Sequence, residues 1–250
     1  MKDFKEAFEK TRLAGSIAAG ALDEVSKIVK PGISTNEIDK LCYEYINDHQ
    51  AYSAPLFYRG FPKSCCTSAN HVVCHGIPSD KILKEGDIVN VDVTAFKDGW
   101  HGDTSRMFKI GKVSIKAEKL INSTYEAMMK AISIVKDNIH LGDIGSTIQK
   151  YVEAEGFSVV QDFCGHGIGE SFHKEPNILH YGEKGSGEKI KAGMIFTIEP
   201  MINLGKYETK ILNDGWTAVS KDKSLSAQFE HTIGVTNDGC EVFTQSNNTN

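Results

Sequence analysis

Four acidic residues lie in apolar segments that we expect to form strands: Asp92, Asp103, Glu199 and Glu230. A carboxylate on a buried strand costs free energy unless a hydrogen-bond network, a proton or a cation neutralises it. Taken singly, each could equally be an edge-strand or turn acid that faces water. Four such acids facing one cleft favour a pair of divalent metal ions, because a bridging carboxylate can bind two cations at once.

Three histidines are further candidates for chemistry. His166 lies in the segment GHGIG (165–169), whose glycines let the backbone come close to a ligand. The glycine spacing does not fit a dinucleotide-binding fingerprint. One histidine with four acids makes an oxygen-rich donor set, which favours Mn, Fe(II), Co or Zn over a thiolate-type zinc site. We also expect His75 and His173, which neighbour glycine-rich or ligand segments, to be functional.

Strands must position these groups. The segment 87–93 (DIVNVDV) alternates, which places Asn90 and Asp92 on one face and three valines on the other. Asp98-Gly99 predicts a hairpin turn, after which residues 100–108 run back and bring Asp103 close to Asp92. Further strands are predicted at 194–198, 209–212, 216–219 and 229–236, with a turn at 213–215.

Four helices are predicted around these strands. Apolar residues recur at near-helical spacing over 4–29, and Pro31-Gly32 ends that helix. Ser34 and Glu37 form a capping box for the second helix. The third covers about 115–136, and the fourth begins near Asp143 and ends at Gly156.

The two halves of the chain resemble each other. Residues 84–92 (KEGDIVNVD) match residues 191–199 (KAGMIFTIE) at an offset of 107, so Asp92 and Glu199 correspond. Six helical-region residues match at an offset of 106, from Ala21 and Ala127 to Ile38 and Ile144. Agreement at nearly one offset predicts an internal duplication. Such a molecule has a cleft between its halves, to which each half delivers an acid.

The overall composition excludes several classes of protein. With 250 residues, 40% of them hydrophobic, the chain suits one globular domain or at most two small ones. A net charge of −5 without a Lys/Arg cluster argues against nucleic acid as the main ligand. We expect neither a signal peptide nor a membrane span, and the six cysteines, which form no CxxC pair, indicate reduced thiols in the cytoplasm.

Six ordered motifs cover nearly the whole chain: VCHGIP (73–78), NVDVT (90–94), WHGDTSRMF (100–108), GHGIG (165–169), FTIEP (196–200) and SAQFEHT (226–232). Together they resemble type I methionine aminopeptidases of the bacterial type. The resemblance implies the α/β (α+β) pita-bread fold, a curved antiparallel sheet with helices outside and two pseudo-symmetric halves. We expect a single catalytic domain over 1–245, with halves of about 1–110 and 111–245, and a disordered tail at 246–250.

The resemblance also implies roles for the candidate residues. Asp92 would bind one metal ion, Asp103 and Glu230 would bridge two, and His166 and Glu199 would complete the other. His75 and His173 would hydrogen-bond the substrate or the tetrahedral intermediate, and Glu199 would assist as general base. The expected reaction is hydrolysis by a metal-bound hydroxide, which removes the N-terminal methionine when the second residue is small.

The substrate pocket is implied by the same resemblance. Five residues would line the slot for the methionine side chain, with Gln228 as a further substrate-binding residue nearby: Tyr58, Phe61, Cys66, Phe172 and Trp216. Sulfur–aromatic contact suits a thioether. The chain departs from the family pattern at Pro55, Arg59 and Phe61, where the family commonly has cysteine, histidine and tyrosine. A monovalent-cation site would lie at Asn70, Val72 and Ser226.

Three alternatives remain open. An X-Pro aminopeptidase or prolidase shares the five ligands but normally carries a large N-terminal domain. A type II enzyme carries a helical insertion, for which the 33 positions from His166 to Glu199 and the 31 from Glu199 to Glu230 leave no room. A non-catalytic binding module on this fold would be expected to have lost ligands. For the enzyme itself we expect nascent polypeptide N-termini as substrate, proximity to the ribosome, no membrane partner and a monomeric state.

Overall fold

The computed structural model describes residues 4–246. Four helices lie at the outside of the molecule: α1 (Lys5–Ile28), α2 (Thr35–Asp48), α3 (Ile115–Ile134) and α4 (Leu141–Ala154). Ser34 caps α2 in the predicted capping box, with Glu37 as its partner. Helix α4 begins two residues before Asp143, because Asp143 is the third helical residue and accepts a hydrogen bond from the backbone N–H of His140.

The predicted hairpin is present and is the longest pair of strands. Strand β4 (Ile88–Lys97) pairs with β5 (Trp100–Lys109) over its whole length. Asp98 and Gly99 have φ values of 49° and 86°, as a two-residue hairpin turn requires. The alternation in β4 is also as predicted, because Val89, Val91 and Val93 pack in the core beneath α1 and α2 while Asn90 and Asp92 face away.

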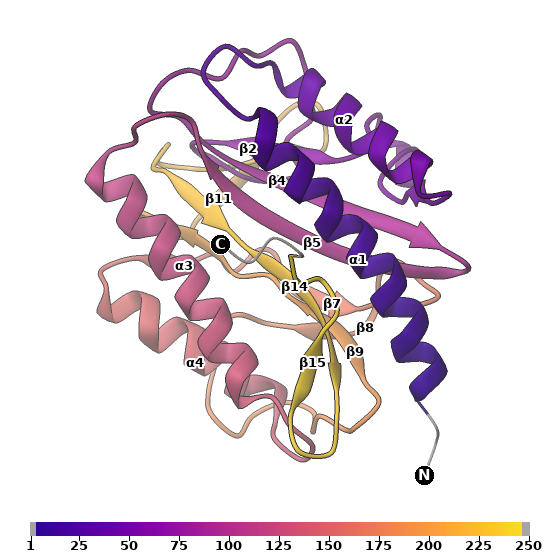
Figure 1. Cartoon of the computed structure of the whole chain (residues 1–250). Coiled ribbons are helices and arrows are strands. Elements are labelled where there is room, and N and C mark those ends of the chain that lie inside the picture. Colours follow the sequence, from indigo (N-terminus) through magenta and orange to yellow (C-terminus); the bar gives the residue numbers. More distant parts are fainter. Residues whose placement is uncertain (1–3, 247–250) are drawn as a thin grey trace.

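A nine-stranded antiparallel sheet contains this hairpin, in the order β1-β4-β5-β14-β9-β7-β8, with β2 pairing on β4 and β15 on β14 (Figure 1). The other strands of this sheet are β1 (Tyr52–Ser53), β2 (Cys66–Ala69), β7 (Gly165–Gly167), β8 (Lys174–Ile178), β9 (Ile195–Ile198), β14 (Glu230–Val235) and β15 (Cys240–Val242). Strand β14, near the end of the chain, therefore joins the first half of the sheet to the second.

Two three-stranded sheets flank the large one. One has the order β13-β10-β6, formed by β6 (Ser158–Val159), β10 (Met201–Asn203) and β13 (Ser226–Gln228). The other has the order β11-β12-β3, formed by β3 (Val72–Cys74), β11 (Thr209–Ile211) and β12 (Ala218–Ser220). The turn predicted at 213–215 closes the β11–β12 hairpin, where Gly215 has a φ of 78°.

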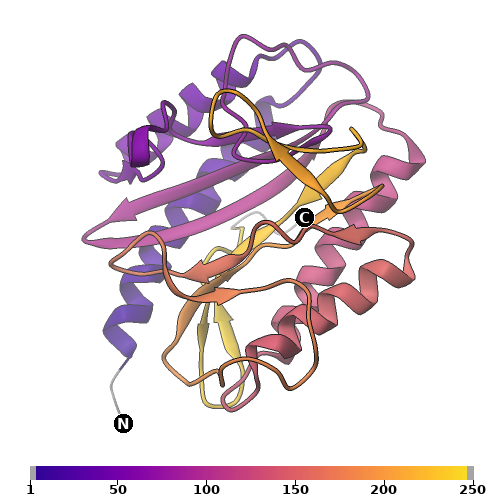
Figure 2. The ribbon, with the colours of Figure 1, turned by 180° about the vertical axis from the view of Figure 1, so that it is seen from behind.

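Each half buries its own helical pair against the large sheet. The first core joins α1 and α2 to β4, through residues such as Leu22, Ile38 and Val91. The second joins α3 and α4 to β9 and β14, through residues such as Met128 and Phe196. None of the four α-helices covers the opposite, concave side of the sheet, which carries only a short 3-10 helix, Tyr58–Gly60 (Figure 2). The helical layer therefore packs on one face of the large sheet only, and the concave face lies opposite it.

The element boundaries repeat between the halves. Helices α1 and α3 end 106 positions apart, α2 and α4 begin and end 106 positions apart, and β4 and β9 begin 107 positions apart. The single bridge Ser34–Ile82 before α2 has its counterpart in the bridge His140–Lys189 before α4. The fold thus has the two pseudo-symmetric halves that the sequence offsets predict.

Helix α1 approaches the sheet very closely at one point. A Cβ atom added to Gly102 of β5 would lie 2.2 Å from the backbone nitrogen of Gly15 in α1. A side chain at position 102 would not fit at this distance, whereas a Cβ on Gly15 would instead meet the backbone of Phe243. The contact fixes α1 directly behind Asp103.

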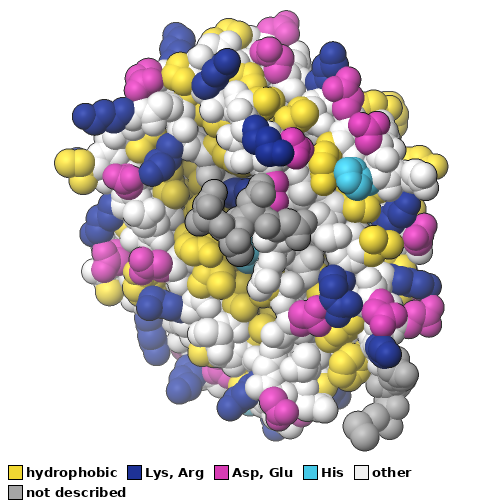
Figure 3. All heavy atoms as spheres, viewed as in Figure 1, with side chains coloured by type: hydrophobic (Ala, Val, Ile, Leu, Met, Phe, Trp, Pro, Cys, Tyr) yellow, Lys and Arg dark blue, Asp and Glu magenta, His cyan; other side chains and the backbone are white. Residues whose placement is uncertain are grey.

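The remaining predictions concern the surface and the C-terminus. Of the predicted disordered tail, Ser246 donates a hydrogen bond to Asp23, 2.6 Å, and 247–250 lie outside the described residues. No helix within residues 4–246 is long and apolar enough to cross a membrane. On the helical face, acidic and basic side chains are interspersed (Figure 3).

Candidate metal centre

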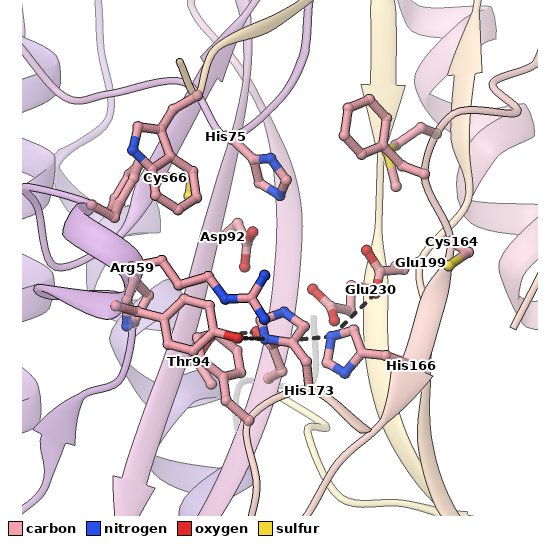
Figure 4. Close-up of a pocket in the computed structure, with 18 of the residues that line it drawn as sticks. Arg59, Cys66, His75, Asp92, Thr94, Cys164, His166, His173, Glu199 and Glu230 are labelled. Atoms are coloured by element: carbon pink, nitrogen blue, oxygen red, sulfur yellow. Dashed lines mark hydrogen bonds and ion pairs between the residues drawn. The ribbon is translucent and has the colours of Figure 1, made fainter. Parts of the chain in front are cut away.

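The five predicted ligands meet in one cavity on the concave face of the large sheet. Each comes from a different strand or strand end: Asp92 from β4, Asp103 from β5, His166 from β7, Glu199 from the end of β9 and Glu230 from β14. All five line a cavity of about 420 Å³ (Figure 4). Both halves of the duplication contribute, and Asp92 and Glu199 occupy equivalent strand positions.

The strand pairing explains how they converge. Asp92 and Glu230 both lie opposite Ser105, on its two neighbouring strands. Asp103 lies two residues along β5 from Ser105, so its side chain projects from the same face. His166 lies on β7, which pairs with β9 just before Glu199.

His166 presents a bare lone pair to the acids. Its Nδ1 lies 3.1 Å from the carbonyl of Gly167, so Nδ1 carries the hydrogen and Nε2 does not. That Nε2 lies 3.7 Å from Oδ2 of Asp103 and 3.6 Å from Oε1 of Glu199. Burial lowers the pKa of His166 to about 4, so the imidazole itself carries no second proton near neutral pH.

Without a cation, the ionised form of each of the four buried carboxylates is unfavourable. Burial raises the pKa of Asp92 to about 7 and that of Glu199 to about 8. Burial and the neighbouring acids also raise the pKa of Asp103 and Glu230 well above their usual values. Oε1 of Glu230 is buried without a hydrogen-bond partner. Acceptors that face one another in this way are stabilised by a positive charge between them.

The donor set therefore fits divalent metal ions. Ligand atoms of Asp103, His166 and Glu230 all lie within 4.8 Å of one another, which one cation can span. Within residues 4–246, no Lys or Arg forms an ion pair with any of the four acids. Four carboxylates would balance two divalent cations, and the additional oxygen atoms match a borderline-hard ion.

Four further side chains hold the ligands in place. Thr94 donates to Oδ1 of Asp103 at 2.7 Å, and Thr197 donates to Oε1 of Glu199 at 2.7 Å. Gln228 donates from Nε2 to Oε2 of Glu199 at 3.3 Å. The backbone N–H of Glu199 donates to Nε2 of His180, 3.1 Å, which is fully buried.

Of these supporting residues, sequence reasoning singled out only Gln228, and it assigned Gln228 to the substrate pocket. Gln228 lies beside Glu199, which lines the cavity. Thr94 and Thr197 could have been found, because each lies two positions from a predicted ligand on the same strand face. No local sequence signal identifies His180.

Aromatic rings form one wall of the cavity. Five of the predicted pocket residues line it: Tyr58, Phe61, Cys66, Phe172 and Trp216. The rings of Phe61 and Trp216 meet edge to face with centroids 5.2 Å apart, and those of Tyr58 and Phe172 are 4.9 Å apart. The wall is apolar on one side of the acids, as a slot for an unbranched apolar side chain requires.

The two other predicted histidines also line the cavity. His75 has a φ of 56°, a left-handed conformation that is uncommon outside glycine and concentrates at functional sites. Nδ1 of His173 lies 3.0 Å from the hydroxyl of Tyr58, and its ring lies 4.2 Å from that of His166. Both imidazoles point to the space above the acids (Figure 4).

Several other lining residues complete the cavity. Pro55 and Arg59, noted above as departures from the family pattern, both line it. Sequence reasoning did not single out Asp162, Phe163, Cys164 or Met201, which also contribute. Asp162–Cys164 precede β7 in a segment without regular alternation, so no pattern marks them.

Comparisons with known proteins identify the family of the chain. The profile of metallopeptidase family M24 matches residues 9–237. The methionine aminopeptidase of Rickettsia prowazekii (strain Madrid E) is 58% identical over 240 residues, which cover 96% of this chain and 93% of the relative. That of Escherichia coli (strain K12) is 56% identical over 241 residues, covering 96% and 91%.

Solved structures separate close relatives from distant ones. The crystal structure of methionine aminopeptidase from Rickettsia prowazekii superposes with a TM-score of 0.95 at 57% identity, covering 96% of this chain and 98% of the other. A prolidase from Pyrococcus furiosus superposes with a TM-score of 0.78 at 22% identity and shares the fold alone. That chain is covered to only 65% of its length, so it is the longer protein.

Proposed function

The chain belongs to metallopeptidase family M24, and on that premise we propose that it is a metal-dependent aminopeptidase that removes N-terminal methionine. The observation that carries the proposal is 56–58% identity over 96% of the chain to relatives named methionine aminopeptidase. X-Pro-cleaving proteins of this fold are only 21–22% identical. The expected substrates are nascent proteins whose second residue is small.

Five residues would hold the metal ions. In this proposal Asp92 binds one ion, Asp103 and Glu230 bridge two, and His166 with Glu199 completes the second site. The bare Nε2 of His166 and the unpartnered Oε1 of Glu230 support it. The oxygen-rich donors suit Co, Mn, Fe(II) or Zn. When bound, such ions polarise a carbonyl and lower the pKa of a water molecule.

The side chains around the ions would bind and orient the peptide. The metal-bearing site would hold the free α-amine, and the aromatic wall would accept the methionine side chain. His173 and His75 donate hydrogen bonds to the peptide carbonyl or the developing oxyanion. The hydroxyl of Tyr58 beside Nδ1 of His173 favours the tautomer whose Nε2–H can donate. Glu199 would serve as general base.

A monovalent cation would bind nearby. Asn70, with a φ of 58°, turns its carbonyl toward β13 and accepts a hydrogen bond from the backbone N–H of Ser226, 2.8 Å. Val72 begins β3 just beyond this turn. Backbone oxygens of Asn70, Val72 and Ser226 form the proposed site.

We further propose that residues 1–245 form one catalytic domain that acts as a monomer in the cytoplasm, close to the ribosome. The six cysteines, all free thiols, suit a reducing compartment. Nascent chains as substrate account for the ribosome-proximal location.

A peptide assay tests the proposal. The purified protein, loaded with Mn²⁺ or Co²⁺ after chelation, is expected to release methionine from Met-Ala-x peptides and to leave x-Pro peptides intact. The chelated protein without added ions serves as the control. Cleavage of x-Pro peptides without cleavage of Met-Ala-x would favour the prolidase alternative, and cleavage of neither would favour a non-catalytic module.

A further inference from the structure

Arg59 is an unpaired positive charge at the wall of the catalytic cavity. The chain has three arginines. Arg12 forms an ion pair with Glu241 and Arg106 forms one with Asp23. Arg59 is exposed and lines the cavity, yet within residues 4–246 it forms no ion pair with any carboxylate.

The backbone holds Arg59 in an unusual conformation. Arg59 has a φ of 47° and Phe57 has a φ of 66°, both in the left-handed region that side chains other than glycine rarely adopt. Backbone hydrogen bonds close the turn, among them those from Phe57 N–H to the Phe61 carbonyl at 2.8 Å and from Phe61 N–H to the Tyr58 carbonyl at 2.9 Å. Uncommon conformations of this kind persist where the surrounding structure determines them, often at ligand sites.

This turn directs the side chain over the cavity. The guanidinium carbon lies 5.3 Å from the ring centroid of Tyr58, within cation–π range. The side chain reaches toward His173 (Figure 4).

The other charged groups of the cavity do not pair with Arg59, because within residues 4–246 none of the acids that line it forms an ion pair with this side chain. The four carboxylates of the floor would be neutralised by two divalent ions. Asp162, the remaining acid of the wall, accepts a hydrogen bond from the hydroxyl of Thr209, 2.6 Å. Arg59 therefore remains as a positive charge without a counter-ion, on the part of the wall that holds the methionine side chain.

The geometry of an extended peptide says which substrate residue meets this charge. Successive side chains of an extended chain point to opposite sides, so the first and third residues share a side. The methionine side chain enters the wall that contains Tyr58, and Arg59 stacks on Tyr58. The side chain of the third residue thus lies on the Arg59 side, beyond the bond that is cut.

We propose that Arg59 binds a carboxylate on the leaving part of the peptide, so that the enzyme favours substrates with Asp or Glu at the third position. This inference rests on the proposed function. A carboxylate at the free C-terminus of a very short peptide offers the same chemistry to the guanidinium. The distinction matters only for the choice of peptides, because nascent proteins present side chains.

The test compares amidated tetrapeptides with the Mn²⁺-loaded enzyme at low ionic strength. Met-Ala-Asp-Ala-NH₂ is expected to have a kcat/KM about 1.5- to 5-fold above that of Met-Ala-Asn-Ala-NH₂, the range of an exposed ion pair. Arg59→Gln should bring that ratio to about 1, and Arg59→Glu should favour Met-Ala-Lys-Ala-NH₂ instead. Lys116→Gln, which removes an exposed positive charge on α3 behind the sheet, should leave the ratio unchanged.

A second pair of peptides separates the two sources of carboxylate. Met-Ala-Ala and Met-Ala-Ala-NH₂ differ only at the C-terminus. If the wild type prefers the free acid and Arg59→Gln does not, then Arg59 binds the terminal carboxylate of that short peptide. A wild-type Asp/Asn ratio of 1 or below, or a ratio that survives in Arg59→Gln, would overturn the inference alone. Failure to cleave any of these Met-Ala peptides would overturn the proposed function and the inference with it.

Discussion

Without its metal ions, the protein should lose unfolding free energy as the pH rises from 6.5 to 8. Burial raises the pKa of Glu199 from 4.5 to about 8, so over this window Glu199 keeps its proton in the folded state and loses it in the unfolded state. Stability falls with pH wherever the folded state binds more protons, by about 1.4 kcal/mol per pH unit. Glu199 alone therefore costs about 2 kcal/mol across the window.

The other groups of the site do not reverse this sign. The pKa values of Asp92, Asp103 and Glu230 are also raised, so these acids act in the same direction. The pKa of His166 is lowered to about 4, so it is neutral in the folded state, whereas the unfolded state loses its remaining proton early in the window; this opposing contribution is only about 0.4 kcal/mol. For a chain of this size, a loss of about 2 kcal/mol lowers the melting temperature by about 4–8 °C.

Thermal and urea unfolding of the chelated protein at pH 6.5 and 8 measures the effect. Added Mn²⁺ should reverse the trend, because ions bind the ionised carboxylates and stabilise only the folded state. Chelated Glu199→Gln should lose about 2 kcal/mol less than the wild type over the same window. A chelated wild-type protein whose stability is constant or increases from pH 6.5 to 8 would refute the reasoning.

Two substitutions on β5 probe the site and its support. Asp103→Ala removes the proposed bridge and should reduce methionine release by more than about 100-fold, since even partners of ligands contribute 10- to 100-fold. The metal content of Asp103→Ala should also fall. The control variant Asp162→Asn, which changes another acid of the same cavity, should keep its metal ions. Near-normal turnover of Asp103→Ala would show that the two-metal proposal is wrong. Gly102→Ala should destabilise the fold by about 1–3 kcal/mol in urea unfolding, because the new Cβ would meet the backbone of α1 at 2.2 Å. Gly239→Ala, whose Cβ would have its nearest neighbour at 4.0 Å, should change stability by less than about 0.5 kcal/mol, and equal effects at the two glycines would contradict the close-contact argument.

Local sequence patterns predicted the elements with strong periodicity. The alternation in β4 placed Asp92 on the face opposite three valines, and Asp98-Gly99 located the hairpin that brings Asp103 close. Ser34 and Glu37 located the start of α2. In each case the residues that determine the structure are neighbours in the sequence, so their spacing suffices.

Elements that depend on distant partners were harder to predict. Strand β7 (GHG) has only three residues, two of them glycines, and it exists because β8 and β9 pair with it. Nine short strands of this kind were not predicted: β1, β2, β3, β6, β7, β8, β10, β13 and β15. Most of them are too short to display an alternating pattern.

Some residues of the candidate site could likewise be predicted from local sequence, whereas others depend on contacts across the fold. The five ligands lie on or at the ends of strands, and the duplication alone related Asp92 to Glu199. The direction of the Arg59 side chain and the hydrogen bond between Gln228 and Glu199 depend on contacts made across the fold. No spacing in the sequence encodes these contacts.

The position of β14 between β5 and β9 governs when an active molecule can form. Its pairing with β5 joins Glu230 to Ser105, residues far apart in the chain, and the other edge of β14 pairs with β9. During synthesis, the edges of β5 and β9 that pair with β14 stay unpaired until residues 230–235 have left the ribosome. Open edges invite pairing between chains, so a chain that stops before β14 is expected to aggregate rather than fold into a weaker enzyme.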